Sequence, residues 1–105
     1  MTVISHREEI TIKGMDGKTT VEAKADVGAD RTTIDYKVAA RVGAGPLVSS
    51  VKVNGEDRRP VAKVWVELEG VEELLAVSLS DREDRSTSAL LGKPFLQNFQ
   101  IQVES

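Results

Sequence analysis

Short segments in which apolar and polar residues alternate recur along almost the whole chain. In residues 61–68, Val64, Val66 and Leu68 fall on one face of an extended segment, and the residues between them fall on the other. Residues 19–25 repeat this pattern. A period of two residues is typical of a half-buried β-strand, and Asp-Gly or Asn-Gly dipeptides of the kind found in hairpins separate several of the segments. The pattern predicts an all-β fold.

Further strands are predicted on apolar and β-branched segments that are bounded by glycine and polar turns. They lie at residues 10–13, 32–37, 47–53, 75–79, 89–92 and 101–103. Residues 80–88 form a polar loop in this interpretation. Residues 94–99 are the only predicted helix, because Pro94 suits a first helical turn, where its missing N–H costs nothing. With 105 residues, we expect one domain that covers residues 1–105.

Charge and hydropathy exclude several classes of partner. The chain has 14 Lys and Arg against 17 Asp and Glu, a net charge of −3, and it lacks the basic stripe of a nucleic-acid-binding module. No apolar run reaches the 18 residues that a membrane span needs. The N-terminus is unlike a secretory signal peptide because it contains His6, Arg7, Glu8 and Glu9. We therefore expect a cytoplasmic protein that binds neither nucleic acid nor membrane.

Few residue types are available for catalysis. The chain has no Cys and one His, which excludes disulfides, thiol chemistry and thiolate metal sites. A Ser-His-Asp triad would have to use His6, which lies near the terminus and is expected to be exposed and inert. Catalytic zinc takes three protein ligands, and the carboxylates around His6 show no such spacing. We predict no metal site and no cofactor.

Asp26 is the strongest candidate for a catalytic group. It directly follows the alternating segment 19–25 and precedes Val27, Gly28 and Ala29. A carboxylate that the backbone holds at the end of a buried strand is placed to do acid–base chemistry. The alternative is that Asp26 shapes a turn by accepting hydrogen bonds from nearby backbone N–H groups, as Asp often does. Taken alone, the tetrapeptide leaves both interpretations open.

Two motifs together resemble a retropepsin subunit. The segment Ala25 to Asp30 matches the Asp-Thr/Ser-Gly-Ala turn of that family, and Leu90-Leu91-Gly92 matches its hydrophobic-hydrophobic-Gly strand, followed by the predicted helix. The chain is most similar to a bacterial and archaeal retropepsin-like family whose members often accompany ATP-grasp glutamate ligases and are commonly labelled ATP-dependent zinc proteases. Other matching stretches lie at residues 12–14, 23–29, 31–34, 59–61, 79–82 and 90–93.

The resemblance implies a closed retropepsin-like β-barrel with one short C-terminal helix, active as a homodimer. A two-fold axis would bring two Asp26 carboxylates together, and like charges so close share one proton. The ionised carboxylate would activate water while the protonated one hydrogen-bonds the scissile carbonyl. Family architecture also interleaves the terminal strands of two copies, here residues 3–4 and 101–103. The implied partners are a peptide substrate, glutamate-rich because of the ligase association, and an ATP-grasp ligase.

Departures from the family pattern keep a second function open. Val27 stands where active members carry Thr or Ser, and its side chain cannot make the hydroxyl's hydrogen bonds. Lys93 replaces an Arg and loses its bidentate fork. The alternative is a catalytically silent retropepsin-fold module for dimerisation or peptide binding. A third interpretation, an unrelated small β-barrel, makes the Asp26 turn accidental.

Two further segments are candidate parts of a substrate site. The flap that folds over substrate in retropepsins maps to residues 47–60, with Asn54 and Gly55 at its tip, although an ordinary surface hairpin fits the segment equally well. Arg82 and Arg85 lie in the predicted loop 80–88. These arginines would attract an acidic substrate, whereas the alternative is that the mixed charges of this loop are only solvated.

Overall fold

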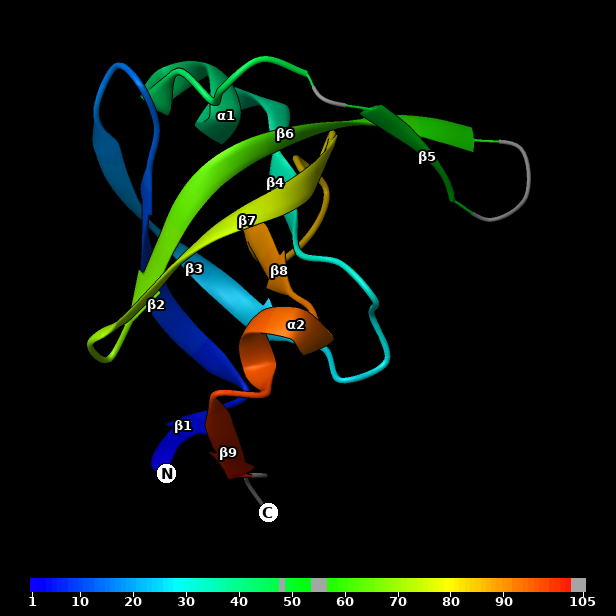
Figure 1. The fold of residues 1–105 in the computed structure, drawn as a ribbon. Helices are drawn as coiled ribbons and strands as arrows, with labels where there is room; N and C mark the ends of the chain where they lie inside the picture. The colour runs from blue at the N-terminus through cyan, green and yellow to red at the C-terminus, as the bar shows by residue number, and fades with distance from the viewer. Residues whose placement is uncertain (48, 54–56, 103–105) are drawn as a thin grey trace.

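The computed structural model describes residues 1–47, 49–53 and 57–102, and Figure 1 shows how its elements are arranged. In chain order these are β1 (Thr2–Ser5), β2 (Arg7–Lys13), β3 (Lys18–Ala25), β4 (Thr33–Asp35), α1 (Tyr36–Val42), β5 (Ser49–Val53), β6 (Asp57–Leu68), β7 (Val71–Ser80), β8 (Ala89–Leu91), α2 (Lys93–Leu96) and β9 (Phe99–Gln102). The all-β prediction is confirmed, with more helix than expected.

Six strands close into a barrel. They follow one another in the order β2-β3-β8-β4-β7-β6, and a pairing of β6 with β2 completes the circuit. The short strands β4 and β8 each make a parallel pair, β4 with β7 and β8 with β3. Each of these six strands thereby has a partner on both sides along at least part of its length. β5 pairs only with β6 and projects from the barrel (Figure 1).

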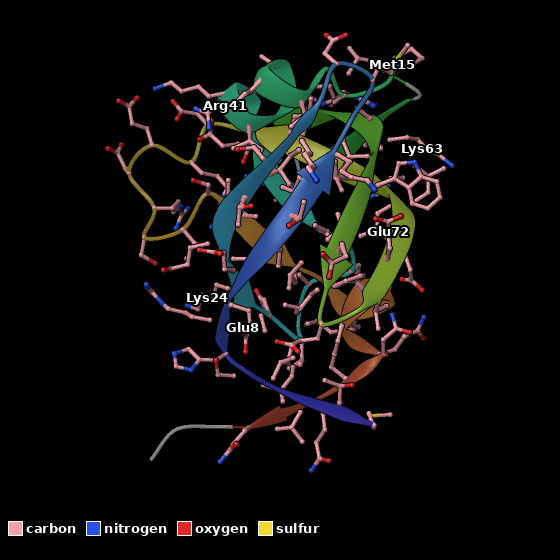
Figure 2. The ribbon with its side chains drawn as sticks, turned by 90° about the vertical axis from the view of Figure 1, so that its left-hand side faces the viewer. Glu8, Met15, Lys24, Arg41, Lys63 and Glu72 are labelled. Carbon is pink, nitrogen blue, oxygen red and sulfur yellow. The ribbon has the colours of Figure 1, made fainter. Side chains whose placement is uncertain are left out.

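The barrel interior is filled by the alternate residues that the sequence pattern identifies. Val64, Val66 and Leu68 are buried on β6, whereas Lys63 and Trp65 between them are exposed. The core is aliphatic apart from the phenylalanines of the C-terminal segment. Figure 2 shows the outer surface, where charged side chains such as Lys24, Lys63 and Glu72 point into solvent.

The prediction of a strand over residues 32–37 is wrong in its second half. β4 ends at Asp35, whose Oδ1 accepts a hydrogen bond from the backbone N–H of Lys37 at 2.8 Å and so caps α1. Gly43 ends the helix in the left-handed conformation, with φ of 68°. The helix is short and contains two valines, but its N-cap and its glycine stop were visible in the sequence. Residues 94–99 are therefore not the only helical segment.

The C-terminal helix is shorter than predicted. α2 covers Lys93–Leu96 with Pro94 in its first turn, and β9 already begins at Phe99. The rings of Phe95 and Phe99 pack against each other with centroids 5.4 Å apart. β9 then pairs in parallel with β1 of the same chain at the foot of the barrel (Figure 1). Val103, part of the predicted final strand, lies outside the described residues.

The two helices of the described ranges are short. Neither of them is long and apolar enough to cross a membrane.

Candidate active site

A tight turn follows β3 and carries Asp26. The backbone N–H of Asp26 donates to the carbonyl of Leu91 at 2.9 Å, and its carbonyl accepts from the N–H of Ala29 at 3.1 Å. Asp26 Oδ1 accepts from the N–H of Gly28 at 2.9 Å. In residues 1–47, 49–53 and 57–102, no group donates to Oδ2. One carboxylate oxygen therefore shapes the turn, and the other remains available on an exposed side chain.

The Leu-Leu-Gly segment holds this turn in place. A Cβ on Gly92 would lie 2.6 Å from the carbonyl carbon of Arg31, so only glycine fits against the chain there. The N–H of Gly92 donates to the buried hydroxyl of Thr32 at 3.1 Å, and the N–H of Lys93 donates to the carbonyl of Ala29 at 2.8 Å. The structure thus brings together the two sequence motifs that lie far apart along the chain.

The two departures from the family pattern lie on the exposed side of the turn. Val27 is 64% exposed. Lys93 Nζ lies 3.4 Å from Asp30 Oδ1, and both side chains are exposed, so this ion pair contributes little to stability. Gly28 packs closely, because a Cβ there would lie 3.3 Å from Asp26 Oδ1.

An open cleft of about 950 Å³ borders the turn. Asp26 and Ala29 line one side, and Arg82 and Arg85 of the loop between β7 and β8 line the other. Neither Thr33 nor Ser78, which also line the cleft, was identified from the sequence. Their hydroxyl oxygens lie 2.7 Å apart and both side chains are buried. Alternation in this strand assigns Ser78 to the face opposite Val77 and Leu79, so the sequence carried no signal for its burial.

The cleft carries several cations. Lys24, Arg31, Arg59, Arg82 and Arg85 line it, together with Asp26, Asp30, Asp81 and Asp84. No role was predicted from the sequence for Lys24, Arg31 or Arg59. None of the ion pairs among the described residues uses Arg59 or Arg85. These two guanidinium groups can therefore still pair with an anionic ligand.

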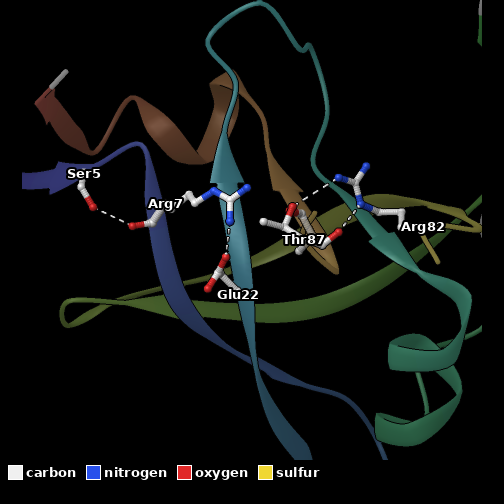
Figure 3. A network of polar contacts seen from close by, with 6 residues as sticks. Ser5, Arg7, Glu22, Arg82 and Thr87 are labelled. Carbon is white, nitrogen blue, oxygen red and sulfur yellow. Dashed lines mark hydrogen bonds and ion pairs between the residues drawn. The ribbon is translucent and has the colours of Figure 1, made fainter. Parts of the chain in front are cut away.

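Arg82 mainly supports its own loop, as Figure 3 shows. Its Nε donates to the carbonyl of Thr87 at 3.0 Å, and its Nη2 lies 3.3 Å from the Thr87 hydroxyl. Its backbone N–H donates to Oδ2 of the buried Asp35 at 2.8 Å. Burial lowers the pKa of Arg82, the nearby Arg85 and Arg59 lower it further, and Asp35 acts in the opposite direction. The Nε and Nη2 groups of Arg82 are therefore engaged within the loop before any substrate arrives.

The predicted flap tip, Asn54 and Gly55, lies outside the described residues. The strands on either side of it form an antiparallel pair, with Ser49 opposite Val61 and Val53 opposite Asp57. This pair projects from the barrel, as a flap would (Figure 1). The assignment of a flap stays a prediction.

The topology and the turn define the fold class: this is a retropepsin-like fold. Scans against protein-family models and against curated proteins find no match. Among solved structures, the chain is similar to the Legionella pneumophila subsp. pneumophila str. Philadelphia 1 protein Lpg0085, described as of unknown function (DUF785). The TM-score is 0.73 at 20% identity, covering 98% of this chain and 92% of that one.

Two proteases or protease-like domains are also similar in structure. EIAV protease, in complex with the inhibitor HBY-793, has a TM-score of 0.65 at 18% identity, over 88% of this chain and 85% of that one. The retroviral protease-like domain of Ddi1 from Leishmania major has a TM-score of 0.54 at 16% identity, over 86% and 74%. At these identities the likeness establishes the fold.

Proposed function

We propose that this chain is an aspartic-type peptidase or amide hydrolase that is active as a homodimer, with Asp26 as its catalytic carboxylate. The observation that carries the proposal is the position of Asp26. Backbone hydrogen bonds fix it at the end of β3, its Oδ2 accepts none from the described residues, and it borders a cleft of about 950 Å³. The retropepsin-like fold adds weight, because solved structures with this fold include EIAV protease.

One Asp26 does not suffice for the chemistry. Amide hydrolysis needs a base that takes a proton from water and an acid that hydrogen-bonds the carbonyl oxygen. Two Asp26 side chains across a two-fold axis would share one proton and supply both roles. The water oxygen bonds to the carbonyl carbon, the C–N bond then breaks, and the nitrogen leaves with a proton. No metal ion takes part in this sequence of steps.

The zinc in the family label does not fit this chain. Within the described ranges, no group of three or more His, Asp or Glu side chains lies close enough together to hold a metal ion. The donor set that catalytic zinc requires is therefore missing from this part of the protein. The assignment to the ligase-associated family rests on the sequence motifs alone.

We further propose that the substrate is an acidic peptide, in keeping with an ATP-grasp ligase as a functional partner. Arg59 and Arg85 line the cleft without a carboxylate partner among the described residues. Charge-assisted hydrogen bonds from arginine to carboxylates are strong and directional. Exchanging Arg85 for Gln should slow cleavage of glutamate-rich peptides more than that of neutral ones. Arg41→Gln, outside this cleft, is the control, and equal effects on both peptide classes would refute the idea.

A catalytically silent dimerisation or peptide-binding module is the second candidate function. Val27 favours it, because this residue cannot make the hydrogen bonds of a Thr or Ser hydroxyl beside the carboxylate. Its exposed side chain suits burial against another protein surface. Such a module would keep the fold and the cleft while cutting nothing.

The deciding experiment is peptide-library cleavage by the native chain and by Asp26→Asn. For a peptidase we expect Asp26→Asn to lower the cleavage rate by at least about 100-fold, the usual contribution of acid–base catalysis, with an unchanged circular dichroism spectrum. Asp84→Asn removes another carboxylate that lines the cleft and should retain cleavage. Peptide binding without cleavage by the native chain would establish the silent module instead.

A further inference from the structure

A smaller pocket of about 270 Å³ lies between α1 and the loop that connects β7 to β8. Lys37, Val38 and Arg41 of α1 line one side of it, and residues of the loop line the other. Figure 2 shows Arg41 on α1, next to this loop. Asp26 and the rest of its turn do not border this pocket. It is therefore distinct from the cleft, although the loop forms a wall of both.

Hydrogen bonds and an ion pair hold the two walls of this pocket together. The buried Asp35 accepts the backbone N–H of Lys37 on Oδ1 and that of Arg82 on Oδ2, both at 2.8 Å. Lys37 Nζ on α1 lies 3.8 Å from Glu83 Oε2 on the loop. Arg82 also bonds Thr87 within the loop through Nε and Nη2. The pocket is therefore formed before any ligand enters it.

Positive charge predominates on the lining of the pocket. Four cationic side chains face two carboxylates: Lys37, Arg41, Arg82 and Arg85 against Asp35 and Glu83. Both carboxylates already have partners in the bonds between the walls. Within the ranges that the structure describes, neither the Arg41 nor the Arg85 guanidinium has a hydrogen-bond or ion-pair partner. Both groups are therefore free to bind an anion in this pocket.

The lining indicates the class of anion. A guanidinium group recognises oxyanions because its N–H donors match two oxygens at once. Ser86 and Ser88 also line the pocket and can add hydroxyl donors. A phosphate group carries about 1.5 to 2 negative charges at pH 7, so it gains more from two arginines than a single carboxylate does. The pocket is smaller than the roughly 300–1,000 Å³ typical of sites for drug-sized ligands, so its ligand is small.

We propose that this pocket binds a phosphate group, as inorganic phosphate or as a small phosphomonoester, between Arg41 of α1 and Arg85 of the loop. The phosphate oxygens accept hydrogen bonds from both guanidinium groups. This site does not depend on the proposed hydrolase activity, because none of its bonds involves Asp26.

The loop between β7 and β8 couples this site to the cleft. Arg82, Arg85 and Ser86 line both of them. A phosphate that pairs with Arg85 withdraws this side chain from an acidic peptide in the cleft, and the two bound anions also repel each other. Phosphate and acidic peptide therefore weaken each other's binding by the same factor. This coupling rests on the acidic substrate of the proposed function.

Isothermal titration with inorganic phosphate tests the site. Arg41 and Arg85 are exposed, so KCl keeps the ionic strength constant throughout. Arg41→Gln and Arg85→Gln should each raise the dissociation constant for phosphate about tenfold, because each removes one charged donor group. Lys24→Gln removes an exposed cation that lines only the cleft, and should change that constant less than about twofold. Equal effects of Arg41→Gln and Lys24→Gln, or no saturable binding by the native chain, would overturn the site.

A titration with glycerol 1-phosphate distinguishes the two sources of the phosphate group. Tighter binding than that of inorganic phosphate would assign the site to a phosphomonoester. Equal or weaker binding would assign it to inorganic phosphate.

Fluorescence anisotropy of a labelled glutamate-rich peptide tests the coupling, with Asp26→Asn as the background so that the peptide stays intact. Saturating phosphate should raise the dissociation constant of the peptide at least about fivefold over KCl at the same ionic strength. Adding Arg41→Gln should abolish this effect. An unchanged peptide affinity with phosphate bound would refute the shared role of Arg85. If no acidic peptide binds, the proposed substrate class fails, whereas the phosphate titration still decides the site.

Discussion

Replacing Gly92 with alanine should destabilise the fold by a predictable amount. A Cβ at this position would lie 2.6 Å from the Arg31 carbonyl carbon, 2.7 Å from its oxygen and 2.9 Å from its nitrogen. These atoms are backbone, so they cannot turn away as the end of a side chain can. Overpacking of this kind costs about 1–3 kcal/mol. For a domain of this size, each kcal/mol lowers Tm by about 4–8 °C, so we expect a decrease of roughly 5–20 °C.

Gly45→Ala is the matched control, measured by the same thermal unfolding followed by circular dichroism. The nearest atom to a Cβ there is the carbonyl oxygen of Lys63 at 3.4 Å, an ordinary contact. We expect its Tm to stay within a few degrees of the native value. If Gly92→Ala unfolds at the native temperature, the close packing of β8 against residue 31 is wrong. The account of how the Asp26 turn is held would then fail with it.

Three other substitutions test separate parts of the site. Asp35→Asn leaves one amide oxygen to replace the two carboxylate oxygens that accept backbone N–H bonds. Urea unfolding should therefore show a free energy of unfolding lower by about 1–3 kcal/mol. An unchanged midpoint would refute the role of Asp35. Thr33→Val leaves the buried Ser78 hydroxyl without its partner, which costs about 1–3 kcal/mol. The Thr33→Val/Ser78→Ala double variant should recover part of that loss, and strict additivity would count against the pair. Val27→Thr introduces the hydroxyl that active retropepsins carry after the catalytic Asp. It should raise kcat for peptide cleavage without raising Tm by more than a few degrees. A lower kcat would contradict the comparison with active retropepsins.

The sequence predicted well the parts of the fold that depend on local pattern. The hairpin of β6 and β7 follows from strict alternation and from the Glu69-Gly70 turn, in which both residues have positive φ. Helix α1 was missed because the segment spans only Tyr36–Val42 and two of its four aliphatic residues, Val38 and Val42, are strand formers. Its capping residues were a better guide than its β-propensity.

The candidate site likewise contains residues that the sequence predicted and residues that it did not. The Asp26 turn and Gly92 were predicted together, because two short motifs in the right order along the chain carry the resemblance and neither does so alone. The Thr33–Ser78 hydroxyl pair joins residues 45 positions apart, and that contact follows from the parallel pairing of β4 with β7, which no local pattern indicates. Arg82 was expected at the substrate, yet its Nε and Nη2 bond Thr87, since a loop of polar residues needs internal partners.

The homodimer alone does not decide between the two candidate functions. The exposed Val27 side chain would gain about 1–2 kcal/mol from full burial, and a second copy could provide that burial with or without catalysis. Asp26 is different, because a silent module has no need of a carboxylate whose Oδ2 accepts no hydrogen bond from the described residues. The Asp26→Asn comparison therefore decides between a hydrolase and a binding module. The solution mass of the protein decides only whether it is a dimer, in which two Asp26 carboxylates could share a proton.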